Sequence, residues 1–194
     1  MKLSTIANLQ SGLVLSRKEA RAPEETVQVY KRLNIRSLND YGKIDREELD
    51  VFPAKEKVDP VNLTQQNDIV IRLFMPLNPT VISENNTGLV IPSQLAVIRL
   101  RDENVLPEYL CYWLSTSKVS EFILAQDGWA KYRVIKIGLL AELDIPIIPI
   151  DQQDTIVKLV SASIQRDQLY QKLLKEERTL TALKIQTFIG GNQS

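Results

Sequence analysis

The longest regular pattern of apolar and polar positions lies near the end of the chain. From Asp151 to Ile189 the sequence contains neither proline nor glycine, and its apolar residues recur at steps of three and four. This spacing places them on one face of an α-helix. Pro149 precedes the segment and Gly190-Gly191 follows it, which is typical of helix ends. The pattern therefore predicts one helix, about 55 to 60 Å long at the helical rise of about 1.5 Å per residue.

The apolar positions of this predicted helix form a seam that begins at Leu159. Its members are Leu159, Ala162, Arg166, Leu169, Leu173, Glu176, Leu180, Leu183 and Thr187. Such a seam is typical of helices that pair, and further apolar residues beside it, such as Leu174 and Phe188, widen it. A terminal helix can instead pack on its own domain, but a domain of about 150 residues is narrower than this helix is long. We therefore expect an antiparallel or bundle-like helical partner, bound through Leu159, Leu169, Leu173, Leu180 and Leu183.

Before this helix, the apolar pattern has the alternation or the short continuous runs that predict β-strands. Strands are predicted at residues 26–33, 68–74, 80–83, 88–91 and 94–100, with a first strand around 13–15. The run at 68–74 is apolar enough to be buried on both faces of a sheet. Residues 17–25 and 39–60 are polar and contain prolines, which predicts exposed loops rather than core elements. A mixed or antiparallel sheet accounts for this spacing.

After Pro107 the apolar period changes to that of a helix. Helices are predicted at residues 107–115, 118–125 and 139–143. Pro146 and Pro149 predict an extended strap that leads into the long helix. The predicted fold class is α/β in the α+β sense. It combines a globular domain with a twisted mixed sheet and short helices at 1–149, a long pairing helix at 150–190 and a disordered tail at 191–194.

Composition narrows the chemistry that the chain can perform. It has 194 residues, with 24 Lys and Arg against 24 Asp and Glu, which argues against indiscriminate binding of polyanions but permits a local basic face. It contains no histidine, so Ser-His, Cys-His and His-metal chemistries are excluded. Its one cysteine, Cys111, is predicted to be a buried thiol in a helix. The start lacks the features of a secretory signal and no apolar run reaches membrane-spanning length, which predicts a cytoplasmic protein without a membrane partner.

Motifs for nucleotide or methyl-group chemistry are missing. There is no glycine-rich loop after a strand for S-adenosylmethionine and no Walker phosphate loop, and Asn78-Pro79-Thr80 is only part of an amino-methylation motif. An acidic cluster of nuclease type can be drawn from residues 45–50, but its spacing is generic and it lies in a predicted solvated loop. We therefore expect no catalytic residue, metal site or cofactor in this chain.

The segment from Gly128 to Ile156 contains a glycine, a short helix, the strap Ile145-Pro146-Ile147-Ile148-Pro149, the pair Gln152-Gln153 and the start of the long helix. This order resembles the signature that closes a target-recognition domain in the DNA-specificity subunits of type I restriction-modification systems. Lys2-Leu3 through Gly12 resembles the opening of that family.

Residues 66–70 resemble the Gly-Asp-Ile strand entry of the same family, and the resemblance spans nearly the whole chain. Three positions depart from the family's pattern. Ile148 replaces a proline, Gln152 replaces a glutamate and Asn67 replaces a glycine. These positions are predicted to be structural, so the departures concern local geometry.

The resemblance implies a non-enzymatic subunit that recognises half of a split target in double-stranded DNA. In this family the long helices pair antiparallel, set the distance between two recognition domains and form the surface on which DNA methyltransferase subunits sit. S-adenosylmethionine and ATP are then expected only on partner subunits. A full-length member has two recognition domains and two long helices, whereas this chain has one of each. Either two copies form a homodimer that recognises a palindromic target, or a missing second half supplies the partner.

Basic and aromatic residues before the strap are candidates for DNA contact. Cations bind phosphates, while an aromatic side chain or arginine can reach base edges. The preferred candidates are Trp129, Lys131, Tyr132, Arg133 and Lys136, followed by Arg72, Arg99 and Arg101. The simpler alternative is that the cations solvate a strand edge and Trp129 covers the core. The alternative function is a coiled-coil protein-protein adaptor whose head does not bind DNA.

Overall fold

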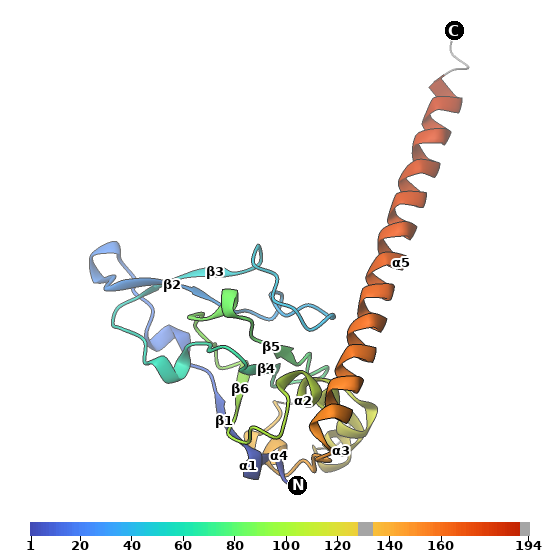
Figure 1. Ribbon diagram of the computed structural model, residues 1–194. Coiled ribbons are helices and arrows are strands. Elements are labelled where there is room, and N and C mark those ends of the chain that lie inside the picture. Colours follow the sequence, from blue (N-terminus) through green and yellow to red (C-terminus); the bar gives the residue numbers. More distant parts are fainter. Residues whose placement is uncertain (128–133, 191–194) are drawn as a thin grey trace. The chain divides into compact units, whose positions relative to one another are not determined.

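The computed structural model describes residues 1–127 and 134–190, and the chain divides into two compact units. We call Met1–Asp154 the head and the helical part from Thr155 onward the rod, and describe each by itself (Figure 1). The division falls within the first turns of the last helix rather than at the predicted boundary at residue 149. The predicted disordered tail at 191–194 lies outside the described residues.

The head contains a four-stranded sheet in the order β1, β6, β4, β5 (Figure 1). Its strands are β1 (Ala7–Ser11), β4 (Ile69–Arg72), β5 (Thr80–Val81) and β6 (Leu95–Leu100). β6 pairs with β1, where Leu9 lies opposite Ile98, and with β4, where Val70 lies opposite Val97. The ladders between the described strands are antiparallel, so the predicted α+β class is confirmed while the mixed sheet is not.

A second, two-stranded sheet consists of β2 (Gln28–Arg32) and β3 (Asp50–Ala54). Its strands are antiparallel, with Tyr30 opposite Phe52. β3 falls in the region predicted to be a loop at 39–60, and Phe52 is fully buried, so that prediction is wrong. Pro53 favoured a loop because it has no amide hydrogen to donate to a ladder; in the structure its carbonyl accepts the Ala20 amide at 2.8 Å.

Short helices complete the head. They are α1 (Leu3–Ile6), α2 (Pro107–Leu114), α3 (Ser117–Asp127) and α4 (Ile137–Ala141), with 3₁₀ turns at Leu15–Arg17, Pro23–Glu25, Pro60–Asn62 and Glu84–Asn86. The helices predicted after residue 107 are confirmed, with ends shifted by one or two residues. α2 begins at Pro107 and buries Leu110 and Leu114. α4 contacts both α1 and β1.

The segments predicted as strands at 13–15 and 88–91 make isolated bridges instead of ladders, and Leu13 pairs with Pro92. The Leu13 amide donates to the Ile91 carbonyl at 2.7 Å, and Val90 makes only isolated bridges. A Cβ atom at Gly12 would collide with the carbonyl oxygens of Ile91 and Pro92. Glycine is therefore required at position 12 by close backbone approach.

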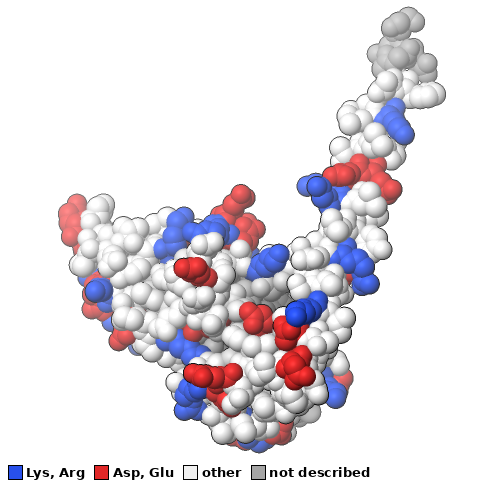
Figure 2. Space-filling view, in the orientation of Figure 1, with Lys and Arg blue, Asp and Glu red and all other residues white. Residues whose placement is uncertain are grey.

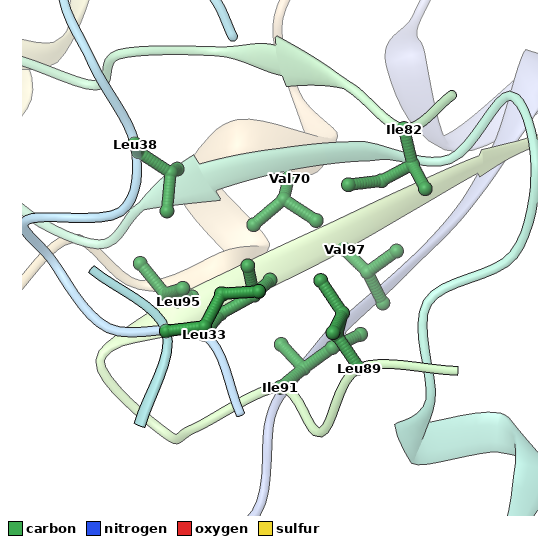
Figure 3. Packing of buried hydrophobic residues seen from close by; sticks show 9 residues of the cluster. Leu33, Leu38, Val70, Ile82, Leu89, Ile91, Leu95 and Val97 are labelled. Carbon is green, nitrogen blue, oxygen red and sulfur yellow. The ribbon is translucent and has the colours of Figure 1, made fainter. Parts of the chain in front are cut away.

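The main hydrophobic core lies on one face of the four-stranded sheet (Figure 3). Strands β4 and β6 contribute Val70, Leu95 and Val97 to it. The surrounding loops supply the rest of the cluster, which is Leu33, Leu38, Leu49, Ile82, Leu89 and Ile91. Ile69 and Ile71 are also fully buried, so β4 is covered on both faces, as predicted. A smaller cluster around Phe52 and Val90 lies against the two-stranded sheet.

The last helix, α5 (Ile150–Gly190), is a single unbroken helix of 41 residues. At about 1.5 Å per residue it is about 60 Å long, which confirms the predicted long helix. Its first turn belongs to the head and the remainder forms the rod. Every side chain from Leu169 to Ile189 is exposed in the single chain.

Candidate functional site

The strap, residues 145–149, is fixed in the head by hydrogen bonds along its backbone. The Ile145 amide donates to the Met1 carbonyl at 2.7 Å, and the Tyr109 hydroxyl donates to the Pro146 carbonyl at 2.7 Å. Tyr109 is buried, and burial raises the pKa of its hydroxyl, which keeps it protonated as a donor. The strap is therefore an ordered, extended connection into α5, as the prolines predict.

Gln153 ties the first turn of α5 to the rest of the head. Its side chain is fully buried, and its Oε1 accepts a hydrogen bond from the Leu106 amide at 2.9 Å. Its Nε2 donates to the Asn104 carbonyl at 2.7 Å and to the Ile148 carbonyl at 2.8 Å. Only a side chain with both an acceptor and two donors can satisfy all three groups. Gln153 thus bonds backbone at the helix start, and the turn at 104–106 is a partner that the sequence did not reveal.

Asn67, one of the three departures from the family pattern, keeps the geometry that a glycine would have. Its φ of 68° lies in the left-handed region, which glycine adopts freely and asparagine more readily than most other residues. The Asn67 amide donates to the Ile82 carbonyl at 2.9 Å, directly before the chain enters β4. The replacement of glycine by asparagine therefore preserves the strand entry.

Arg99, a candidate for DNA contact, binds a buried carboxylate. Its Nε lies 2.9 Å from Asp68 Oδ1 and its Nη2 lies 3.1 Å from Asp68 Oδ2. Nη2 also donates to the Leu63 carbonyl at 2.7 Å. Burial raises the pKa of Asp68, against the lowering effects of Arg99 and the Gln65 amide. The pair joins β6 to the entry of β4.

Arg72 and Arg101 also bind backbone within the head. Arg72 Nη2 donates to the carbonyls of Ile35 and Leu38, at 2.8 and 2.7 Å. Arg101 Nη2 donates to the Ser4 carbonyl in α1 at 2.7 Å. DNA contact by Arg72, Arg99 or Arg101 would require these bonds to be released. The structure gives the three arginines a positioning role, and their contact with DNA stays a prediction.

Lys136 is the preferred DNA candidate that falls within the described residues. Its side chain is exposed directly before α4, and its carbonyl accepts the Leu139 amide at 3.0 Å. The other preferred candidates, Trp129, Lys131, Tyr132 and Arg133, lie outside the described residues. The Ile135 amide, next to Lys136, donates to the Leu73 carbonyl at 2.8 Å, so the segment that holds Lys136 lies beside the end of β4, at Arg72.

The sequence did not reveal the outer face of the two-stranded sheet, which we call the ribbon face. The register of β2 and β3 and the hydrogen bond from the Val27 amide to the Ala54 carbonyl show which side chains point outward. The six outward positions are Val27, Val29, Lys31, Val51, Pro53 and Lys55. Each of the three valines is more than half exposed, and none of the six positions is acidic. Lys31 and Lys55 form no ion pair within the described part of the chain. Figure 2 shows Lys and Arg side chains over β2 and β3, with acidic side chains beside them. This face was missed because β3, the partner strand, was not predicted.

The seam of α5 is exposed, as a pairing surface must be in a single chain. Its five leucines have exposed fractions of 52 to 67%. Tyr170, Leu174 and Phe188, which lie beside the seam, are also exposed. Burial of a leucine side chain contributes about 1.5 to 3 kcal/mol, so this surface has a strong tendency to be covered. The partner that covers it is not revealed by the helix alone.

Cys111 carries the one thiol of the chain. Cys111 Sγ donates to the Pro79 carbonyl at 3.2 Å, and burial raises the pKa of the thiol to about 12. Among residues 1–127 and 134–190, no cluster of three or more acidic or cysteine side chains is placed to hold a metal ion. No helix in these ranges has the length and apolar character needed to span a membrane.

Comparison with known proteins finds likeness in structure and none in sequence families. No family model and no curated protein matches the chain. The crystal structure of the HsdS subunit from Thermoanaerobacter tengcongensis aligns with a TM-score of 0.70 and 17% identity. A chain from a structure on complex assembly and conformational transition of the type I R-M system aligns with a TM-score of 0.72 and 18% identity.

Both alignments cover almost all of this chain, 96 and 97%. They cover 47% of each matched chain, so this chain spans about half the length of those proteins. The head and α5 together therefore have the fold of one half of a type I restriction-modification specificity subunit.

Proposed function

We propose that this chain is the DNA-specificity component of a type I restriction-modification system, recognising half of a split target and docking a methyltransferase subunit. The observation that carries the proposal is the structural alignment with the HsdS subunit and with a chain of a type I R-M complex, which covers 96% or more of this chain and so includes its head, strap and long helix. A protein of this kind supplies sequence recognition and no catalysis. S-adenosylmethionine and ATP are bound by its partner subunits.

The DNA-reading surface in this proposal combines the ribbon face with the segment around Lys136. A two-stranded β-ribbon fits the major groove of B-DNA, and lysines bind phosphate oxygens or guanine. Exposed valines can contact thymine methyl groups, as small apolar side chains do in direct readout. Lys31 and Lys55 form no ion pair with any residue that the structure describes, whereas the guanidinium groups of Arg72, Arg99 and Arg101 are hydrogen-bonded within the head.

The rod serves as the assembly surface in this proposal. The seam leucines pair two copies into a homodimer, and a two-fold arrangement of identical heads recognises a palindromic target. Val160, Leu174 and Phe188 recur at intervals of fourteen residues beside the seam, which makes the apolar stripe wider than one helix partner requires. The methyltransferase subunit docks on this additional flank.

The direct test is methylation mapping with this chain as the sole specificity component. The chain is co-expressed with a methyltransferase subunit of a type I system, and the modified bases in the host DNA are located. The expected result is methylation at one split sequence whose two halves are inverted repeats. A modified sequence with unrelated halves would contradict the homodimer. Absence of selective methylation or duplex retention by the assembled complex would favour the protein adaptor.

The ribbon face is tested by charge reversal of both lysines, Lys31→Glu with Lys55→Glu, in the same complex. Because each phosphate contact contributes close to one unit of the salt slope, the slope is expected to fall by about two and the affinity to fall about tenfold or more. Lys43→Glu with Lys118→Glu changes the same number of exposed charges away from the ribbon face and is the matched control. Equal effects of the two double variants would remove the ribbon face from the DNA-reading surface.

A further inference from the structure

The seam of α5 contains two charged positions, and both face solvent in the single chain. Arg166 Nη2 lies 3.5 Å from Asp167 Oδ1, and Glu176 Oε1 lies 3.8 Å from Lys172 Nζ. These pairs are exposed and hold the side chains only weakly. A charge that is covered when helices pair is costly unless it meets an opposite charge. Arg166 and Glu176 therefore restrict the arrangements in which a partner can cover the seam.

The seam is symmetric about Gln171. Leu169 and Leu173 lie equally far from Gln171 along the sequence, and so do Arg166 and Glu176. The same holds for Ala162 and Leu180, and for Leu159 and Leu183. When two such helices run antiparallel about a two-fold axis that crosses the seam at the level of Gln171, the members of each pair lie side by side across the interface. Leucine then meets leucine, small Ala162 meets large Leu180, and Arg166 meets Glu176.

Other arrangements of two copies do not bring Arg166 of one copy beside Glu176 of the other. In a parallel pair in register, Arg166 would lie beside the same arginine of the second copy, and Glu176 beside the same glutamate. In an antiparallel pair shifted by one heptad in either direction, both charged residues would face leucines. Like charges repel, and a charge against leucine is left without an opposite charge when it is covered. Of the heptad registers compared, the one centred on Gln171 alone satisfies both charges.

We propose that two copies of this chain pair through α5 as antiparallel helices in the register centred on Gln171, with Arg166 of each copy bound to Glu176 of the other. The inference rests on the proposed function in taking the rod as the surface that pairs two copies, and it adds the register of the two helices and the ion pairs that set it. A second copy is favoured over an unrelated partner because the complement of each seam residue is present in the same helix. The ion pairs specify direction and register, while the leucines supply most of the affinity.

Charge reversal tests the register in the full-length chain. Arg166→Glu alone and Glu176→Arg alone each place like charges together twice in a homodimer, so each is expected to weaken dimerisation about tenfold or more. The doubly reversed chain, R166E with E176R, restores both ion pairs and is expected to dimerise like the parent. A mixture of the two single variants is expected to form heterodimers, since each copy then faces opposite charges. Sedimentation velocity over a concentration series measures all four, with Arg178→Glu, on the opposite side of the helix, as control.

The outcomes separate the register from the proposed function. Dimerisation unaffected by either single reversal, or not restored by mixing, overturns the register. A parent chain that stays monomeric at high micromolar concentration overturns the second copy as partner and favours a helix from another chain. Loss of dimerisation in the single variants, together with an assembled parent complex that shows no sequence-selective DNA binding, supports the register and contradicts the DNA-specificity function.

Discussion

The head and the rod differ in which side chains they bury and which they expose. In the head, arginines and glutamine are directed inward, where Arg72, Arg99 and Gln153 satisfy backbone carbonyls or a buried carboxylate. In the rod, leucines are directed outward, and from Leu169 to Ile189 no side chain is covered. The described part of the head therefore buries a core and most of its polar contacts within one chain, whereas the rod exposes an apolar seam. We therefore expect the head to determine stability and the rod to determine assembly.

The largest expected effect separates these two roles. Replacing Leu169 and Leu173 by lysine puts four uncompensated charges at the centre of the proposed dimer and removes leucine burial worth about 1.5 to 3 kcal/mol per side chain. Dimerisation is expected to weaken at least about 100-fold, as measured by sedimentation equilibrium, because about 2.7 kcal/mol already gives that factor. The thermal unfolding of the head should not change.

Matched variants check that the position, rather than the added charge, causes this effect. Gln168→Lys with Gln171→Lys adds the same charge to the same region of α5, away from the seam. These substitutions should leave dimerisation within about threefold of the parent, which corresponds to roughly 0.7 kcal/mol. A lower unfolding temperature of the head in the leucine variant would show that head and rod are not independent.

A smaller effect tests whether the buried hydrogen bonds of Gln153 stabilise the head. Gln153→Ala leaves the Leu106 amide and the carbonyls of Asn104 and Ile148 without their partners. Because a buried polar group without a partner costs about 1 to 3 kcal/mol, the free energy of unfolding is expected to fall by about 3 kcal/mol in urea denaturation. The adjacent, exposed Gln152→Ala should change it by less than about 0.5 kcal/mol. Equal effects at both positions would mean that the Gln153 bonds do not stabilise the first turn of α5.

The difference between the two regions also explains what the sequence could predict. The rod was predicted almost to the residue, because an uninterrupted helical period is a local signal that no tertiary contact modified. In the head, α2 to α4 and β4 were predicted, while β3 was not, because Pro53 and its polar neighbours resemble a loop. The roles of Arg72 and Arg101 could not be predicted, since their carbonyl partners lie as far away in sequence as Ile35 and Ser4. Long-range contacts of this kind determine the head and are absent from the local pattern.

Two glycines test how tightly the head is packed. Gly12→Ala would place a Cβ against the carbonyl oxygens of Ile91 and Pro92, so the backbone must shift. Overpacking of this kind costs about 1 to 3 kcal/mol, which calorimetry should detect as a lower unfolding temperature. Gly138→Ala is the control, since nothing lies within 4 Å of its Cβ and it occupies α4. Because alanine favours a helix more than glycine does, this substitution should raise stability by up to about 1 kcal/mol. If both substitutions lowered the unfolding temperature equally, the loss at Gly12 could not be attributed to the close contact with Ile91 and Pro92.

The smallest expected effect concerns alkylation of the Cys111 thiol, which should be negligible in the native head. Thiol alkylation requires the thiolate, and a Cys111 pKa of about 12 leaves only about one thiol in ten thousand ionised at about pH 8. Native protein should therefore react negligibly with iodoacetamide, whereas the same protein in urea should be labelled once per chain. A cysteine at an exposed position of the rod, Gln171→Cys in a Cys111→Ser background, should react in the native state at the rate of a free thiol. Labelling of native Cys111 at a rate close to that of the rod cysteine would show that the head opens readily. The thiol in α2 of the head would then be as accessible to reagent as a thiol on the surface of the rod.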